Sequence, residues 1–191
     1  MRKGYIYITS SGYDPEKGTP FNDPYLGKQP TLGACMPNIR KWVAPGDEIF
    51  FVSGKTEGVS QFVVGGFAVA DKIDAMTAYE TLPEHRLRLN REGKLLGNII
   101  IDSKGHQHPL DTHSVSSFSR RIENYVIGRD PVVLKLPHEI QKGREQTVYF
   151  LTGLFRKKGN TPYEVMGRAS KLDEQQLKEL RDWLFSIKAG H

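Results

Sequence analysis

The sequence predicts one α+β domain over residues 1–191, built on a strongly curved, mixed β-sheet with short flanking helices. Three observations support this fold class. Short runs of β-branched and aromatic residues recur along the chain, the pair Gly65-Gly66 interrupts one of them, and an amphipathic pattern occupies the C-terminus. A chain of this length buries enough surface to fold without a disulfide or a metal.

The predicted strands are apolar runs bounded by turn residues. They cover residues 5–9, 48–53, 61–70, 98–102 and 131–136, while residues 147–151 fit either a strand or the start of a helix. Gly65 and Gly66 mark a bulge or sharp bend, which would curl the sheet toward a barrel.

Helices are predicted from their caps and from their spacing of apolar residues. Pro37 suits the first turn of a short helix that ends before Ala44, and Asp74 suits the cap of a helix over 74–80. The C-terminal helix combines capping-box spacing at Ser170 and Asp173 with an apolar stripe formed by Leu177, Leu180, Leu184 and Ile187. Residues 10–30, rich in proline and glycine, are predicted to form a long loop.

Composition excludes several classes of protein. The single cysteine, Cys35, excludes an internal disulfide framework and a Cys-Cys zinc knuckle. The chain shows no long apolar stretch, so we expect a cytoplasmic protein without a signal peptide or a membrane partner. The formal charge of +5 favours anionic ligands, although the basic clusters can instead be solvated surfaces.

Several short motifs follow one another in the first 80 residues. They are Pro-Phe-Asn-Asp-Pro-Tyr (20–25), Thr-Leu-Gly-Ala-Cys (31–35), Pro-Asn-Ile-Arg (37–40), the Gly46-Asp47 turn and the glycine-bearing strand ending at Ala70. In this order they resemble the PUA-like superfamily, which includes the EVE, ASCH and YTH domains. The resemblance is greatest to the second of the nucleotide-modification-associated families, although Met36 stands where a lysine is expected. It returns near residues 144–155.

The resemblance implies a PUA-like, strongly curved mixed β-barrel with a base-sized pocket at its mouth. Related domains hold a modified base by stacking on aromatic side chains and by hydrogen bonds to its edge, and stacking contributes about 1–3 kcal/mol per base. The predicted base or nucleotide contacts are Tyr7, Phe21, Asn22, Tyr25, Cys35, Arg40, Trp42 and Ser53. Each aromatic could instead belong to the core, and Cys35 could be a buried, inert thiol.

Phosphate contacts are predicted at basic side chains that follow the motifs. They are Arg40, Lys41, His85 and Arg86. Arginine is favoured because its guanidinium group binds two phosphate oxygens at once. The alternative for each is a solvated surface position.

A histidine-rich segment offers a different chemistry. His106, His108, Asp111 and His113 lie within eight residues and could bind a transition metal. Their spacing does not match common zinc patterns, and Pro109 prevents a regular helix, so a polar surface turn is the alternative.

The sequence therefore leads to three functional hypotheses. The first is non-catalytic recognition of a modified base or nucleotide, without a cofactor, in DNA or nucleotide modification or in defence in bacteria or their phages. The second is a metal-dependent enzyme acting on nucleotides or nucleic acid, with the metal held by the histidine-rich segment. The third is a protein-interaction module without a nucleotide ligand.

Overall fold

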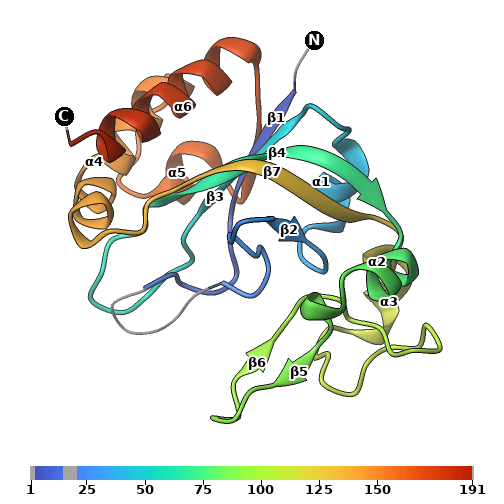
Figure 1. Cartoon of the computed structure of the whole chain (residues 1–191). Helices are drawn as coiled ribbons and strands as arrows, with labels where there is room; N and C mark the ends of the chain where they lie inside the picture. The colour runs from blue at the N-terminus through green and yellow to red at the C-terminus, as the bar shows by residue number, and fades with distance from the viewer. Residues whose placement is uncertain (1–2, 15–20, 191) are drawn as a thin grey trace. The chain divides into compact units, whose positions relative to one another are not determined.

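A computed structural model describes residues 3–14 and 21–190, so Pro20 of the first motif lies outside the described residues. Figure 1 shows the order of the helices and strands along the chain. These are β1 (Gly4–Ile8), β2 (Thr31–Leu32), α1 (Pro37–Trp42), β3 (Glu48–Val52), β4 (Val63–Ile73), α2 (Ala75–Thr81), a 3₁₀ turn (Pro83–His85), β5 (Arg88–Leu89), β6 (Leu95–Leu96), α3 (Val115–Ile122), β7 (Tyr125–Val133), α4 (Pro137–Phe155), α5 (Pro162–Met166), β8 (Ala169–Leu172) and α6 (Glu174–Lys188).

Six of the strands form one mixed sheet in the order β2-β7-β4-β3-β1-β8. β1 pairs with β3 in parallel, whereas β1 with β8, β3 with β4, and β2 with β7 are antiparallel. The predicted α+β class with a mixed sheet is confirmed. The predicted barrel is wrong: within residues 3–14 and 21–190 the sheet stays open, because its edge strands β2 and β8 do not pair with each other.

The bend predicted at Gly65 coincides with an irregularity in the sheet. The register between β3 and β4 shifts between Phe51 and Val52, and Phe51 pairs with Gly65. Gly65 has φ +145°, and a Cβ there would lie 2.1 Å from the carbonyl oxygen of Val132. Only glycine fits this close approach of two backbones.

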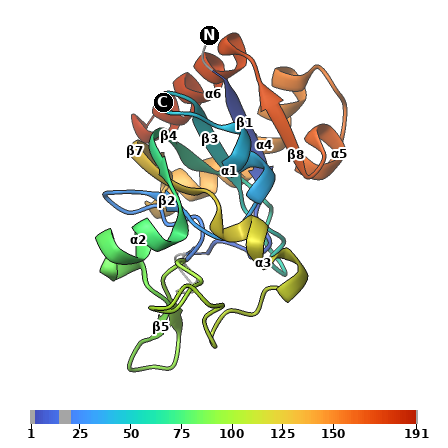
Figure 2. The same cartoon turned by 90° about the vertical axis from the view of Figure 1, so that its right-hand side faces the viewer.

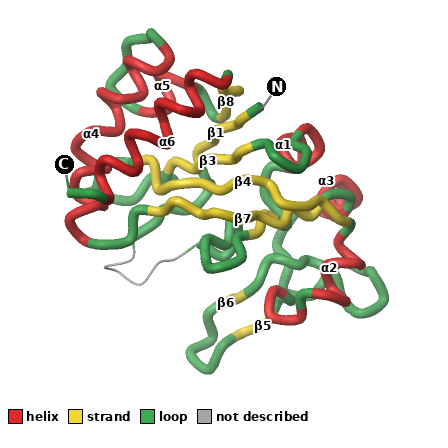
Figure 3. The backbone as a smooth tube through the Cα atoms, turned by 45° about the horizontal axis from the view of Figure 1, so that its top comes forward, coloured by secondary structure: helices red, strands yellow, loops and turns green. Residues whose placement is uncertain are grey.

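The described chain divides into two compact units, and the prediction of a single domain over 1–191 remains a prediction. The first unit comprises residues 1–20, 47–68 and 130–191. In it α4 packs on α5 and α6, and α6 lies beside α4 in Figures 1 and 3. The predicted C-terminal helix and its apolar stripe are confirmed, since Leu177, Leu180, Leu184 and Ile187 of α6 are all buried. The predicted capping box is wrong: Asp173 is the cap and Gln176 its partner, while Ser170 lies in β8. Residues 147–151 belong to α4, so they are helical.

The second unit comprises residues 21–46 and 69–129. It contains α1, which begins at Pro37 as predicted, and α2, whose cap Asp74 accepts hydrogen bonds from the backbone N–H groups of Met76 and Thr77. The strand predicted over 98–102 is wrong. Ile99 and Ile101 form isolated bridges and are buried under α2 and neighbouring side chains. No described helix has the length and apolar character needed to cross a membrane.

Candidate functional site

A cleft in the first unit begins where β1 and β3 end side by side. The Thr9 hydroxyl donates to the carbonyl oxygen of Ser11 over 2.7 Å and accepts from the backbone N–H of Gly54 over 2.9 Å. A Cβ at residue 54 would lie 2.6 Å from the Ser11 carbonyl oxygen and 2.8 Å from that of Thr9. Glycine at 54 therefore lets the two strand ends close into one polar floor.

The opposite wall comes from α5 and the start of β8, which follow each other beside β1 (Figure 2). Thr161 caps α5 by accepting from the backbone N–H of Glu164 over 3.2 Å, and Pro162 occupies the first turn. This start of the helix presents Tyr163 with 61 % of its surface exposed. The backbone of Arg168 is held by β1, because its carbonyl oxygen accepts from Ile8 N–H over 3.0 Å.

The cleft has a volume of about 490 Å³ and carries exposed cations on both sides. Lys55 follows the floor, Arg168 stands on the opposite wall, and neither forms an ion pair within the described part of the chain. The carboxylate of Glu164, which also lines the cleft, accepts from the backbone N–H of Asn160 over 2.8 Å. The Gln61 amide nitrogen donates to the Ser53 carbonyl oxygen over 2.8 Å, which holds that side chain in the cleft wall.

The chemical groups of this lining suit the binding of a small molecule. Its lining combines an exposed aromatic ring, two cations, an amide and hydroxyl groups, and its volume falls in the range of small-molecule sites. The one carboxylate in the lining is Glu164, and no histidine or cysteine joins it.

Two of the sequence-predicted residues lie in the first unit, next to the floor of the cleft but not in its lining. Tyr7 is buried and packs edge-to-face against Phe51 with ring centroids 5.3 Å apart. Ser53 is also buried, and its hydroxyl accepts from the backbone N–H of Phe62 over 3.0 Å. Both side chains hold strands together rather than offering a surface to a ligand.

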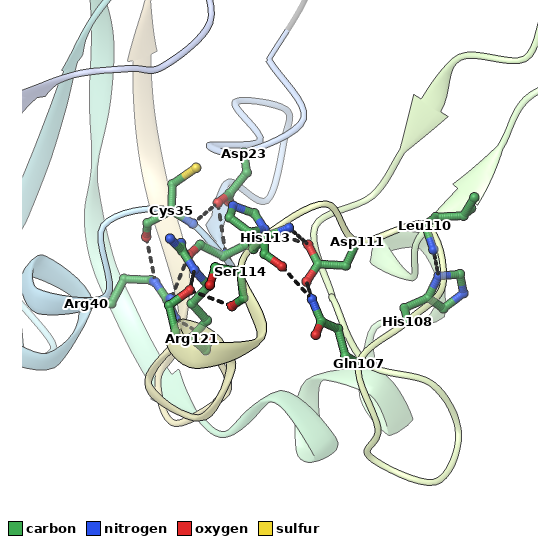
Figure 4. A network of polar contacts seen from close by, with 12 residues as sticks. Asp23, Cys35, Arg40, Gln107, His108, Leu110, Asp111, His113, Ser114 and Arg121 are labelled. Atoms are coloured by element: carbon green, nitrogen blue, oxygen red, sulfur yellow. Dashed lines mark hydrogen bonds and ion pairs between the residues drawn. The ribbon is translucent and has the colours of Figure 1, made fainter.

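Arg40 lies in the second unit and is fully buried. Its guanidinium group donates to the carbonyl oxygens of Ala34, Cys35, Arg121 and Asn124, with 3.0 Å to Ala34 and 2.8 Å to Cys35 (Figure 4). These bonds fasten α1 to the segment before it and to the C-terminal end of α3. The structure thus places the leading phosphate candidate in the interior, and we leave it out of the proposed ligand contacts.

Cys35 sits in a second part of the same network. The Asp23 carboxylate accepts from three consecutive backbone N–H groups, at 2.7 Å from Gly33, 2.9 Å from Ala34 and 2.5 Å from Cys35, and from the Asn98 amide at 3.1 Å. Burial, reinforced by the negative charge of Asp23, raises the pKa of the Cys35 thiol far above its ordinary value. The thiol therefore stays protonated, and a nucleophilic role has no support.

The remaining aromatic candidates differ in exposure. Phe21 is buried, whereas Tyr25 and Trp42 are 40 % and 56 % exposed. The Tyr25 ring meets the ring of His85 edge-to-face, with centroids 4.8 Å apart. The Asn22 amide donates to the Leu95 carbonyl oxygen over 2.5 Å. None of these side chains lines the cleft of the first unit.

The other basic candidates are also divided between surface and interior. Lys41 is exposed, while His85 is buried and burial lowers its pKa. The guanidinium group of Arg86 stacks on the Tyr79 ring at 4.0 Å from the centroid and donates to the Tyr79 carbonyl oxygen over 2.8 Å. Of these three residues, Lys41 is exposed, Arg86 is partly buried and His85 is buried.

The histidine-rich segment does not assemble a set of metal ligands. His113 Nδ1 lies 2.6 Å from Asp111 Oδ1, but His108 Nδ1 accepts from the Leu110 N–H over 3.1 Å (Figure 4). His106 Nδ1 lies 3.6 Å from the Asp102 carboxylate instead. Within residues 3–14 and 21–190, no group of three or more His, Cys, Asp or Glu side chains could hold a metal ion. The alternative of a metal at this segment has no geometric support.

The residues that line the cleft were missed by sequence reasoning. Lys55, Gln61, Thr161, Tyr163 and Arg168 come from three separate segments. Two local signals point to them in retrospect: the Thr-Pro start of a helix, which exposes the following tyrosine, and the Gly167-Arg168 turn after it. Neither signal says that the segments meet.

Comparisons with known proteins give no family for this chain and only a low similarity to solved structures. No protein-family model matches the chain, and no curated protein matches its sequence. Among solved structures, a hypothetical protein from Leishmania major is similar with a TM-score of 0.48 and 10 % identity, covering 98 % of each chain. Human THYN1, crystallised in complex with DNA containing 5-methylcytosine, is similar with a TM-score of 0.39 and 11 % identity, covering 95 % of this chain and 97 % of its own. With TM-scores below 0.5, neither similarity bears on function.

Proposed function

We propose that the chain recognises a nucleotide, without catalysis, in the cleft between the ends of β1 and β3 and the start of α5. The observation that carries this proposal is the meeting of Tyr163, Lys55 and Arg168 around one polar cleft of about 490 Å³. An exposed ring supplies a stacking surface for any base, and the cations supply charge for a phosphate.

The edge of the base would meet the polar groups of the floor and wall. The Gln61 amide is oriented by its bond to the Ser53 carbonyl oxygen, and the Thr161 hydroxyl is fixed as a helix cap. Groups held in this way discriminate between bases, because a ligand that leaves them unpaired loses affinity. We further propose that the base is a modified one; this finer proposal rests on the sequence resemblance to the nucleotide-modification-associated family.

The test is a binding measurement on the full chain by isothermal calorimetry, with plain and base-modified deoxynucleoside and ribonucleoside 5′-monophosphates. Tyr163→Ala should weaken binding of the preferred nucleotide about 5- to 150-fold, which corresponds to the loss of one stacking contact. Stability should change by less than about 0.5 kcal/mol, since the side chain is exposed.

The matched control is Tyr149→Ala, because Tyr149 is an exposed tyrosine of the same unit (86 %) that does not line the cleft. It should bind as the unaltered chain does. An unchanged nucleotide affinity of Tyr163→Ala would exclude stacking of the base on Tyr163. Binding of none of the nucleotides would reject the proposal and favour a protein-interaction module.

A further inference from the structure

A second cleft of about 480 Å³ adjoins the first. Lys55, Gln61 and Thr161 line both, so the two clefts share one wall. Each is large enough for one nucleotide by the usual range of ligand sites. The first unit therefore carries two nucleotide-sized spaces with a lysine at their junction.

The second cleft has a different chemical character from the first. Val59 and Val148 are partly exposed and provide apolar surface, whereas Pro162 is buried and the Arg144 side chain is only 18 % exposed. The guanidinium group of Arg144 is held in place by two neighbouring side chains. Its Nη2 lies 3.4 Å from the Asp14 carboxylate, and its central carbon lies 5.6 Å from the centroid of the Phe62 ring. Because Pro162 and two guanidinium nitrogens of Arg144 are buried, the partly exposed side chains of Val59 and Val148 form the apolar surface on which a base can lie.

The charges of the second cleft disfavour a phosphate there. Glu57 and Glu145 line it and are exposed, and they oppose the positive charges of Lys55 and Arg144. A free terminal phosphate would meet repulsion from two carboxylates, whereas a base and its ribose are uncharged. Lys55, on the shared wall, is left as the cation nearest to both spaces.

We propose that the two clefts bind two consecutive nucleotides of a single strand, with the phosphodiester between them beside Lys55. This inference rests on the proposed function and narrows its ligand class from a free nucleotide to single-stranded nucleic acid. The base in the first cleft stacks on Tyr163, and the neighbouring base lies on the apolar wall of the second.

The experiment compares each deoxynucleoside 5′-monophosphate with the homodinucleotide of the same base, using the full chain. The dinucleotide should bind at least about ten-fold more tightly than its mononucleotide. Val148→Phe, which places a larger side chain in the second cleft, should remove this advantage and leave mononucleotide binding unchanged. Ser60→Leu, at an exposed position that also lines the second cleft, tests the same point if Val148→Phe fails to fold.

Lys55→Gln should weaken dinucleotide binding and make it less sensitive to salt, and Lys157→Gln, at an exposed lysine outside both clefts, should do neither. Equal affinity for mononucleotide and dinucleotide would overturn this inference while leaving the proposed function standing. Binding of neither ligand would reject both.

Discussion

Substitution of Arg40 distinguishes most clearly between a structural role for its side chain and a role in binding phosphate. Its guanidinium group donates to four backbone carbonyl oxygens, and one of them, that of Ala34, also accepts from Arg121 over 2.7 Å. Removing the Arg40 side chain thus removes a hydrogen-bond donor from the other three carbonyl oxygens, to which the Arg121 side chain does not donate. At about 1–3 kcal/mol for each buried acceptor, reduced where water can enter, Arg40→Ala should cost about 3–5 kcal/mol of unfolding free energy.

A loss of that size is a large fraction of the total stability of a typical domain and is readily measured by urea unfolding. Arg40→Lys should lose most of the same amount, because one ammonium group cannot reach carbonyl oxygens on several segments at once. For the variant that still folds, the salt dependence of nucleotide affinity should equal that of the unaltered chain. A stable Arg40→Ala protein whose affinity depends less steeply on salt would refute the argument, since that is the signature of a lost phosphate contact.

Three further predictions follow from particular contacts. Gly54→Ala should lower the unfolding free energy by about 1–3 kcal/mol and weaken nucleotide binding, since the new Cβ would lie 2.6 Å from the Ser11 carbonyl oxygen. The control in urea unfolding and calorimetry is Gly153→Ala, because nothing lies within 4 Å of a Cβ there. Equal behaviour of the two variants would contradict the close approach at Gly54. Because burial lowers the pKa of His85 below 6.5, the folded state binds fewer protons than the unfolded state, and the unfolding free energy should fall as the pH drops below 6.5. In urea titrations at several pH values, His85→Gln should flatten this dependence. An unchanged pH profile in the variant would exclude His85 as its source. The raised pKa of the Cys35 thiol predicts that iodoacetamide modifies Cys35 only as the protein unfolds, as followed by mass spectrometry, and rapid alkylation of the folded chain would show a reactive thiol instead.

The elements that could be predicted from sequence are those fixed by neighbours in the chain. Asp74 caps α2 because its side chain reaches N–H groups two and three residues on, and the stripe from Leu177 to Ile187 faces the core by helical spacing alone. Residues 147–151 look β-rich but are helical. Thr147, Leu151 and Leu154 are buried at helical spacing, which a five-residue window cannot reveal.

The openness of the sheet was beyond local inference for a related reason. Gly65 does sit where strands approach closely, as predicted, but a bend in one strand does not decide whether the edges of a sheet meet. That depends on whether the edge strands β2 and β8 pair with each other, and such pairing would join segments far apart in sequence. The same apolar character that predicted a strand at Ile99 and Ile101 served instead to bury these side chains without regular pairing.

The candidate site fails to follow from sequence because the location of a charge is not a local property. Arg40 occurs in a basic cluster beside an exposed tryptophan, which is the context of a phosphate contact, yet carbonyl groups more than 80 residues away draw it into the interior. Lys55 and Arg168 have unremarkable neighbours, yet the parallel pairing of β1 with β3 and the antiparallel pairing of β1 with β8 bring their segments to one cleft. A formal charge of +5 is therefore informative only once each cation has been assigned to a surface or to a core. A cation can attract a phosphate only where the solvent, and hence the ligand, can reach it. The proposed binding site therefore lies at the ends of β1 and β3 and the start of α5, and not at the sequence motif around Arg40.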